Sequence, residues 1–285
     1  MKQVGLIGDP VSHSLSPLMQ QAAFDEFHIE ANYVLWETHR DQLTDKIASL
    51  RSPAILGANV TIPYKEDVMP LVDVCDPYAA RIGAINTIVN RGGRLFGYNT
   101  DAPGFIMALI ECIAFHCVGK KVVILGTGGA ARAAAVGLLE KEVGEVVLLG
   151  RNESHLQNLL RHLYSVSVKY HKTTHIKGVL FGDSEVTESL SNADLVVNAT
   201  PIGLKVNDSM LLIDVDVLSN SALVMDMIFN PPSTPLLRMA RERGCQVLNG
   251  LSMLLYQGAL AFELWTGRPA PIRVMQKALG LAKEG

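Results

Sequence analysis

A glycine-rich turn constrains the fold of this chain more than any other segment. The turn reads G-T-G-G-A-A at residues 126–131, after an apolar run at 120–125 and before a helix-like stretch at 130–143. The next apolar run, residues 145–150, completes a strand–turn–helix–strand order. The turn fits the pattern G-x-G-x-x-G/A in the context that a dinucleotide-binding fingerprint requires. We therefore predict a parallel α/β unit that binds a dinucleotide; the alternative is a glycine turn in an α/β unit without a ligand.

Each small residue of this turn has a physical role in a dinucleotide-binding site. Gly126 permits the tight turn, and Gly128 leaves out a Cβ atom where a pyrophosphate would approach. Ala131 allows the helix to pack closely on the strand, and the amino end of that helix favours phosphate charge. The residues expected around the pyrophosphate are Gly126, Gly128, Gly129, Ala130 and Ala131.

The end of the second apolar run bears on the choice of cofactor. An acidic residue there would bind the ribose 2′-hydroxyl of NAD, but this chain has Gly150-Arg151-Asn152. Arg151, helped by Arg132, could pair with a 2′-phosphate. The sequence thus favours NADP(H) and leaves NAD(H) open, because Glu153 follows two residues later and Arg151 could instead stack on adenine.

Apolar, β-rich runs alternate with helix-like stretches along the whole chain, which predicts an α/β fold with mostly parallel strands. At 285 residues the chain is long enough for two domains. In the first hundred residues, Gly92-Gly93 separates two runs that predict a β-hairpin. Pro17 behind a Ser16 cap predicts the start of one helix, and residues 64–75 predict another.

Composition excludes several classes of function. The net charge of −3 gives no electrostatic footprint for nucleic acid or an anionic membrane as the main partner. No apolar run reaches the roughly 18 residues that a membrane-spanning helix needs, and the N-terminus predicts a strand rather than a signal peptide. The four cysteines show no metal-ligand spacing, so we expect reduced thiols in a cytoplasmic protein and no metal site. The His-rich segment 162–175 is interpreted as a solvated loop.

Four short segments of the first hundred residues carry polar groups at predicted strand ends and turns. They are H-S-L-S-P at 13–17, N-V-T-I-P-Y-K at 59–65, G-A-I-N-T at 83–87 and G-Y-N-T-D at 97–101. Together they offer hydroxyls, amides, one cation and one anion at the kind of sheet edge where α/β proteins bind ligands. This set suits a small polyhydroxylated acid and a proton transfer. Taken singly, each could serve structure alone, as an ion pair of Lys65 with Asp101 would.

These segments resemble those of the shikimate dehydrogenase family, which includes the quinate/shikimate dehydrogenases. The resemblance covers essentially the whole chain, with several specific motifs in the right order. The matching stretches are S-L-S-P at 14–17, N-V-T-I-P-Y-K at 59–65, G-A-I-N-T at 83–87, G-Y-N-T-D at 97–101, G-T-G-G-A-A-R at 126–132, N-A-T-P-I-G at 198–203 and N-G-L-S-M-L-L-Y-Q-G-A at 249–259.

The resemblance implies a reversible, NADPH-dependent reduction of 3-dehydroshikimate to shikimate, a step of aromatic amino acid biosynthesis. It also implies that Lys65 and Asp101 are the catalytic pair. We expect Lys65 to be the general acid–base and Asp101 to orient it, and the sequence leaves open which of the two carries the transferred proton. The other residues that it implies are Ser14 and Ser16 for the substrate carboxylate, Thr61, Asn86 and Gln257 for ring hydroxyls, and Thr200, Ile228 and Gly250 along the cofactor.

The family resemblance further implies two α/β domains separated by a cleft. Residues 1–102, completed by C-terminal helices at 250–285, would bind substrate, and residues 103–249 would form a Rossmann-type domain for the dinucleotide. We expect a small-molecule substrate, no nucleic acid and no membrane, and a monomer or a homodimer.

Two segments depart from the family pattern. Where NADP-preferring members usually have N-R-T-x-x-R, residues 150–155 read G-R-N-E-S-H, so only the first arginine is kept. Phe229 stands where the family often has tyrosine. These departures keep an NAD-dependent quinate/shikimate dehydrogenase as the alternative, and a binding module without turnover is a third hypothesis.

Overall fold

The computed structural model describes residues 1–170, 173–204 and 211–281. The chain divides into two compact units, Met1–Gly104 with Leu254–Gly285, and Phe105–Met253. Each unit is built around its own six-stranded sheet with helices packed on it. The predicted α/β class is therefore confirmed.

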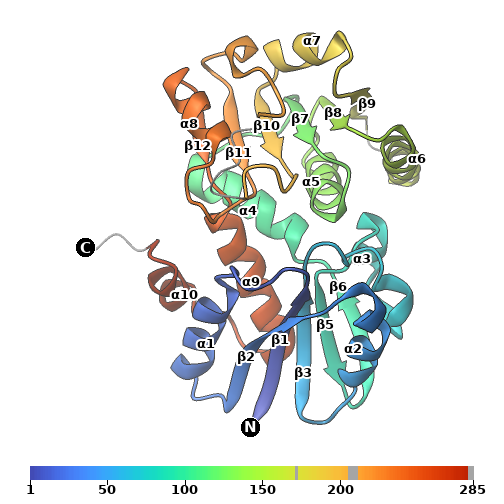
Figure 1. The fold of residues 1–285 in the computed structure, drawn as a ribbon, viewed down its shortest axis with the longest axis vertical. Coiled ribbons are helices and arrows are strands. Elements are labelled where there is room, and N and C mark those ends of the chain that lie inside the picture. Colours follow the sequence, from blue (N-terminus) through green and yellow to red (C-terminus); the bar gives the residue numbers. More distant parts are fainter. Residues whose placement is uncertain (171–172, 205–210, 282–285) are drawn as a thin grey trace. The chain divides into compact units, whose positions relative to one another are not determined.

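The first unit contains a mixed sheet in the order β2-β1-β3-β5-β6-β4 (Figure 1). Strand β1 pairs in parallel with β2 and β3, whereas β5 pairs antiparallel with β3 and β6. The pair β5–β6 is the hairpin predicted at Gly92-Gly93. The bounds are β1 (Lys2–Gly8), β2 (Ala31–Glu37), β3 (Ile55–Val60), β4 (Val74–Cys75), β5 (Thr87–Arg91) and β6 (Arg94–Tyr98).

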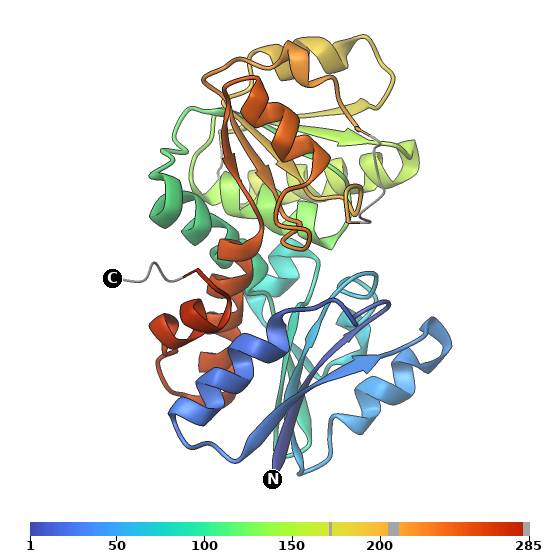
Figure 2. The ribbon, with the colours of Figure 1, turned by 60° about the vertical axis from the view of Figure 1, so that its left-hand side comes forward.

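Helices cover both faces of this sheet. Helices α1, α9 and α10 lie on one face, and α2 and α3 lie on the other (Figures 1 and 2). Phe24 of α1 packs against Phe262 of α9 with ring centroids 5.5 Å apart, and Trp265 donates to the Ile88 carbonyl at 3.0 Å. The C-terminal helix α9 is thus part of the core of the first unit. The bounds are α1 (Ser16–Glu26), α2 (Leu43–Ser49), α3 (Pro77–Ile82), α9 (Leu251–Thr266) and α10 (Ile272–Ala278).

The prediction of a helix over residues 64–75 is wrong. This stretch holds only a short 3-10 turn, Met69–Leu71, and strand β4, which pairs with β6. Pro70 lacks the N–H that an α-helix would need there. The helix begins later, at Pro77, where the Asp76 side chain accepts from the Tyr78 amide at 2.8 Å.

The start of α1 also differs by one position from the prediction. Ser16 is the first helical residue rather than the cap, Leu15 is the N-cap, and the helix has no side-chain cap. The Ser16 amide instead donates to Oγ of Ser14 at 3.2 Å. The local turn is therefore held by a serine–serine contact that the capping pattern did not predict.

The second unit contains an entirely parallel sheet in the order β12-β11-β10-β7-β8-β9. Because helices cover both faces, the strands are continuous apolar runs. The strand order reverses between β7 and β10: the chain goes outward from β7 to β9 and then returns to the other side of β7 with β10. Sheets of this kind bind ligands at this position, at the carboxyl ends of their strands. The bounds are β7 (Lys121–Leu125), β8 (Glu145–Gly150), β9 (His175–Leu180), β10 (Leu195–Asn198), β11 (Leu223–Asp226) and β12 (Gln246–Leu248).

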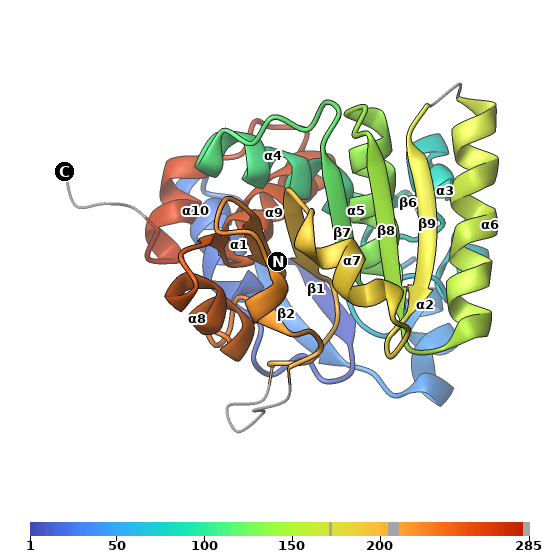
Figure 3. The same cartoon turned by 90° about the horizontal axis from the view of Figure 1, so that it is seen from above.

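Figure 3 shows helix α6 lying along strands β8 and β9 of this unit. Helix α6 runs to Lys169, so the prediction of a solvated loop at 162–175 is wrong for its first half. Leu156, Leu159 and Leu163 recur at helical spacing and are buried, which places most of the polar residues between them toward solvent. Residues 171–172 lie outside the described part of the chain. The remaining helices are α4 (Asp101–Ile113), α5 (Gly129–Glu140), α6 (Glu153–Lys169), α7 (Glu185–Ser191) and α8 (Pro235–Glu242).

Among the described residues no helix has the length and apolar character needed to cross a membrane. Nor do these residues contain a group of three or more His, Cys, Asp or Glu side chains arranged to hold a metal ion.

Candidate functional site

Four chain segments reach the same edge of the sheet in the first unit. The serines at 14 and 16 follow the end of β1, and Thr61 and Lys65 follow the end of the neighbouring parallel strand β3. Asn86 directly precedes β5, which runs antiparallel to β3, and Asp101 follows β6. The strand directions therefore bring the predicted polar segments to one edge.

The backbone around Lys65 is fixed on both sides of its side chain. The buried Tyr64 hydroxyl donates to the Thr38 carbonyl at 2.8 Å, and burial raises the pKa of this phenol. The Lys65 carbonyl accepts from the Ile85 amide at 2.7 Å. The ammonium group is thus presented from a well-anchored turn.

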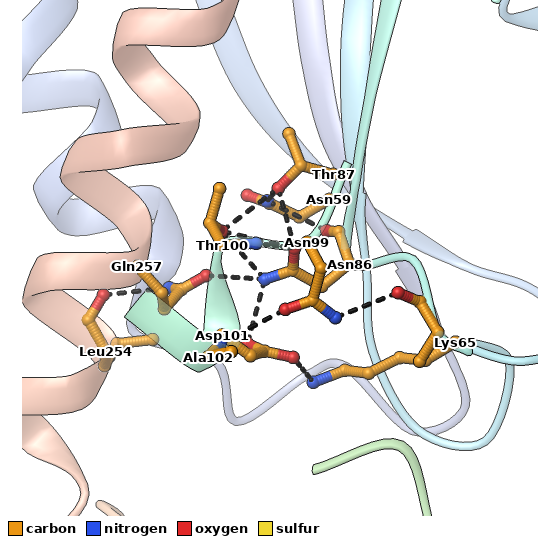
Figure 4. Close-up of polar contacts among 11 residues, drawn as sticks. Asn59, Lys65, Asn86, Thr87, Asn99, Thr100, Asp101, Ala102, Leu254 and Gln257 are labelled. Atoms are coloured by element: carbon orange, nitrogen blue, oxygen red, sulfur yellow. Dashed lines mark hydrogen bonds and ion pairs between the residues drawn. The ribbon is translucent and has the colours of Figure 1, made fainter. Parts of the chain in front are cut away.

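Lys65 and Asp101 form a partly buried ion pair (Figure 4). Lys65 Nζ donates to Oδ2 of Asp101 at 2.6 Å, and the two side chains are 17% and 5% exposed. Oδ1 of the same carboxylate accepts from Nδ2 of Asn86 at 2.8 Å. A cation and an anion held this closely can position and transfer a proton at a substrate oxygen.

Asn86 is the centre of the polar cluster around this pair. Its Nδ2 donates to Asp101, to Oγ1 of Thr100 at 2.9 Å and to Oε1 of Gln257 at 3.3 Å. Its Oδ1 accepts from the Thr100 amide at 2.7 Å and from Oγ1 of Thr87 at 3.1 Å. Since an amide nitrogen has only two hydrogens, the three acceptors share them and the side chain is held in one orientation.

Gln257 comes from α9, far along the chain, and completes the cluster (Figure 4). Its Nε2 donates to the Leu254 carbonyl at 2.8 Å, which leaves Oε1 facing Asn86. A Cβ atom at Gly104 would lie 2.6 Å from the Gln257 backbone nitrogen. Glycine at this position therefore allows α4 and α9 to approach closely enough to place Gln257.

Ser16 lies next to this cluster, and Tyr33 and Asn59, for which no role was predicted, lie between them. Ser16 is 4% exposed and lies beside Tyr33, whose hydroxyl donates to Oδ1 of Asn59 at 2.8 Å. Nδ2 of Asn59 donates in turn to Oγ1 of Thr87 at 3.1 Å. Burial raises the pKa of Tyr33, so its hydroxyl stays neutral. In the sequence Tyr33 cannot be distinguished from any other strand residue. Its role becomes evident only from the side-chain hydrogen bond to Asn59, which lies on another strand of the sheet.

The structure thus brings together four predicted residues in direct contact: Lys65, Asp101, Asn86 and Gln257. Ser14 contacts the Ser16 amide, and the Thr61 amide donates to the Ile7 carbonyl at 2.8 Å at the same edge. The segments around Asn59, Thr87 and Thr100 were recognised as polar, but their contribution to orienting Asn86 was not.

In the second unit the predicted cofactor residues follow the carboxyl ends of the parallel strands. Gly126 comes after β7, Arg151 after β8, Thr200 after β10, Ile228 after β11 and Gly250 after β12. In a parallel sheet these ends share one edge. Residues far apart in sequence are therefore gathered at the edge where the topology predicts a ligand.

The glycine-rich turn has the backbone that its sequence predicts. Gly126 has φ +113°, a conformation that favours glycine. A Cβ atom at Gly128 would meet open space, and Gly128 is the N-cap of α5, which has no side-chain cap. Ala131 is fully buried. The amino end of α5 therefore presents backbone amides beside a space without side chains, an arrangement that fits a pyrophosphate.

Arg151 is exposed immediately after β8. The next residue, Asn152, caps α6 by accepting from the His155 amide at 3.0 Å. The cap fixes the backbone beside Arg151, at the carboxyl end of β8.

These features define an α/β protein that belongs to the dinucleotide-dependent oxidoreductases. One unit has the parallel sheet and glycine-rich turn of a nucleotide-binding fold. The other presents a lysine–aspartate pair within a cluster of amides and hydroxyls, which suits reduction or oxidation at a hydroxyl-bearing carbon.

Comparison with known proteins identifies the family. Residues 6–88 match the family described as shikimate dehydrogenase substrate binding domain, residues 109–220 match shikimate / quinate 5-dehydrogenase, and residues 250–279 match the shikimate 5′-dehydrogenase C-terminal domain. The shikimate dehydrogenase (NADP(+)) of Desulforamulus reducens is 41% identical, over 96% of this chain and 93% of that protein. That of Moorella thermoacetica is 42% identical, over 97% and 92%. The chain belongs to the shikimate dehydrogenase family.

Solved structures agree with this assignment. Shikimate dehydrogenase from Aquifex aeolicus is 32% identical with a TM-score of 0.87, covering 98% of this chain and 97% of its own. The Thermus thermophilus enzyme in complex with NADP(H) and shikimate is 34% identical with a TM-score of 0.84, covering 98% and 99%. Quinate dehydrogenase from Corynebacterium glutamicum in complex with NAD is 28% identical with a TM-score of 0.86, covering 99% of both chains.

Proposed function

We propose that this chain is an NADP-dependent shikimate dehydrogenase that reversibly reduces 3-dehydroshikimate to shikimate. The observation that carries the proposal is the Lys65–Asp101 pair, joined to Asn86 and Gln257 in a chain of this family. Curated relatives about 40% identical over nearly the full chain are shikimate dehydrogenases that use NADP(+).

The two units would bind different ligands. We assign substrate binding to residues 1–102 with the C-terminal helices from 250, and dinucleotide binding to residues 103–249. Support comes from the two compact units, since all candidate substrate residues fall in one and all candidate cofactor residues in the other. The boundaries in the proposal follow the sequence and differ by two to four residues from those of the compact units.

Substrate recognition would use the polar edge of the first unit. Ser14 and Ser16 would hold the carboxylate through their hydroxyls, and Thr61, Asn86 and Gln257 would bind ring hydroxyls. A site built to hydrogen-bond substrate hydroxyls discriminates against an analogue that lacks them. The fixed orientation of Asn86 supports its assignment, because the amide is held in place by Asp101 and Thr100 before a ligand binds.

Lys65 would act as the general acid in reduction and the general base in oxidation. Reduction of a ring carbonyl places negative charge on its oxygen, which a nearby ammonium stabilises and then protonates. Asp101 would orient Lys65 and accept a hydrogen bond from the same substrate hydroxyl. The contact of 2.6 Å between the two side chains supports their action as one unit.

The second unit fits a nicotinamide dinucleotide. Gly126, Gly128, Gly129, Ala130 and Ala131 would surround the pyrophosphate, and Thr200, Ile228 and Gly250 would line the path toward the nicotinamide. The open space at Gly128 and the uncapped start of α5 support this assignment. When bound, the dinucleotide supplies the hydride, while the protein supplies position and electrostatics.

NADP(H) is the cofactor that we assign. Arg151 would contact the 2′-phosphate, and its exposed position directly after β8 supports this. The alternative, an NAD-dependent quinate/shikimate dehydrogenase, is not favoured because the curated relatives compared use NADP(+) and the quinate dehydrogenase structure is only 28% identical.

A cytoplasmic location and a monomeric or homodimeric state complete the proposal. The location is supported by the four cysteines, all of which are free thiols. Gel filtration with light scattering would decide the oligomeric state.

The test is the absorbance of the reduced nicotinamide with purified protein in four mixtures, shikimate or quinate with NADP(+) or NAD(+). We expect reduction with shikimate and NADP(+), and much slower reduction in the other three. Faster reduction with quinate and NAD(+) would make the alternative correct. No reduction in any mixture, with protein shown to be folded, would contradict the proposed function.

A further inference from the structure

A buried carboxylate stands at the carboxyl end of the second sheet. Asp226 ends β11 and is 0% exposed. Its Oδ1 accepts from Nδ2 of Asn198 and from the Ile228 amide, both at 3.0 Å, and its Oδ2 accepts from Oγ1 of Thr234 at 2.6 Å. The partners are neutral, and burial raises the pKa of Asp226. An apolar residue would fill such a core position at lower cost, so the carboxylate calls for an explanation beyond packing.

The first partner, Asn198, extends the contact to the loop after β10. Asn198 and Asp226 lie opposite each other where the parallel strands β10 and β11 end. Oδ1 of Asn198 accepts from the Thr200 amide at 3.0 Å and from Oγ1 of Thr200 at 2.7 Å. The orientation of the Asn198 amide, which Asp226 selects, therefore fixes Thr200.

Thr200 in turn lies against the glycine-rich turn. A Cβ atom at Gly126 would be 3.1 Å from Cγ2 of Thr200 and 3.2 Å from the Ala199 carbonyl oxygen. The loop after β10 is thus packed directly on the first glycine of that turn. A shift of Thr200 would change the shape of the site at the point where the strand order reverses.

The second partner, the Ile228 amide, extends the contact to the loop after β12. The Ile228 carbonyl accepts from the Gly250 amide at 3.1 Å, and a Cβ atom at Gly250 would lie 2.0 Å from the Met227 carbonyl oxygen. Residues 227 and 228 are therefore held between Asp226 and Gly250. The loops that follow β10, β11 and β12 all depend on one carboxylate.

We propose that Asp226, acting through Asn198 and the Ile228 amide, is a positioning residue that holds Thr200, Ile228 and Gly250 in the geometry that binds the dinucleotide. The inference rests on the proposed function, because it assigns these loops to the cofactor. Asp226 itself does not touch the ligand in this scheme. Its carboxylate accepts hydrogen bonds from the Asn198 side chain and the Ile228 amide, and so holds each of them in one orientation. These two orientations determine the shape of the cofactor site.

The test measures the Kd of NADP(+) by calorimetry, together with the Kd of shikimate and the melting temperature. Asp226→Ala removes both acceptors and should raise the Kd of NADP(+) about tenfold or more. Asp226→Asn should restore it to within about threefold of wild type, since the amide oxygen can accept from Asn198 and Ile228 while its NH₂ donates to Thr234. The Kd of shikimate should stay unchanged in both variants.

The chain offers a matched control at the opposite edge of the same sheet. Asp194 precedes β10, accepts from Lys120 Nζ at 2.8 Å and from the Lys121 amide at 2.9 Å, and so also joins neighbouring segments. Asp194→Ala should lower the melting temperature without changing the Kd of NADP(+). If Asp226→Ala does not fold, Asn198→Ala removes both the donor to Asp226 and the acceptor for Thr200, and should weaken NADP(+) binding in its place.

The outcomes separate this inference from the proposed function. Wild-type protein that binds neither NADP(+) nor NAD(+) overturns both. Wild-type binding that Asp226→Ala leaves unchanged, or that Asp194→Ala weakens equally, overturns the inference alone, because Asp226 then serves only stability. Failure of Asp226→Asn to restore binding would overturn the role of the two accepted hydrogen bonds.

Discussion

Replacement of Lys65 tests the proposed chemistry most directly. Lys65→Ala removes the ammonium that lies 2.6 Å from Asp101 and leaves Oδ1 of that carboxylate bound to Asn86. Loss of a general acid–base typically costs a factor of about 10² to 10⁴ in rate. We therefore expect kcat to fall at least about a hundredfold, which corresponds to about 2.7 kcal/mol in the barrier.

The effect on substrate binding should be much smaller. The residues assigned to the carboxylate and ring hydroxyls keep their positions, because Asn86 is held by Thr87 and Thr100 independently of Lys65. The KM for shikimate should stay within about threefold of wild type, since a group that acts in the transition state changes kcat more than KM.

A double-mutant cycle sharpens this prediction. Asp101→Asn should also lower kcat strongly, because it weakens the pair that orients the lysine. If the two side chains act as a unit, the double variant should be about as slow as the slower single variant, not slower by the product of the two factors. Steady-state rates of NADP(+) reduction with shikimate measure all three. Near-wild-type turnover of Lys65→Ala would refute the catalytic assignment, and multiplicative losses would refute the joint action of the pair.

Three further predictions follow from individual contacts. Gly104→Ala would place a Cβ atom 2.6 Å from the Gln257 nitrogen, so the Kd of shikimate measured by calorimetry should rise about fivefold or more, while NADP(+) binding stays unchanged. Arg151→Ala should lower the preference for NADP(+) over NAD(+), read as a ratio of kcat/KM values, about fivefold to tenfold, because one exposed charge-assisted contact is lost. Burial raises the pKa of Asp226 above its unfolded value, so the free energy of unfolding of wild type relative to Asp226→Asn, measured in urea, should fall as pH rises from about 4 through the raised pKa. A difference that does not change with pH would contradict the raised pKa.

Much of the second unit could be predicted from sequence because its signals are local. The apolar runs at 120–125 and 145–150 are strands, and the glycine-rich turn between them has the φ value that its first glycine predicts. In a parallel sheet the carboxyl ends of the strands share an edge, so residues that follow strands could be predicted to lie at one edge of the sheet.

The contacts that orient the site could not be predicted in the same way. The hydrogen bonds from Tyr33 to Asn59 and from Asn86 to Gln257 join residues 26 and 171 positions apart, and no local pattern specifies such pairs. The helix predicted at 64–75 failed for a related reason, because β4 forms there through pairing with β6. The His-rich segment was misread because polar residues on the outer face of α6 obscured the buried leucines.

The discontinuous construction of the first unit sets an order of assembly during synthesis. Strands β1 to β6 leave the ribosome first, but Gln257 and Trp265, which contact Asn86 and Ile88, are translated only after the entire second unit. The second unit is continuous in sequence and has all its strands available earlier. Closing the long loop between Asn86 and Gln257 is entropically easier once the intervening residues have already folded into a compact body. The polar cluster around Lys65 and Asp101 is thus completed only after the whole second unit has been translated.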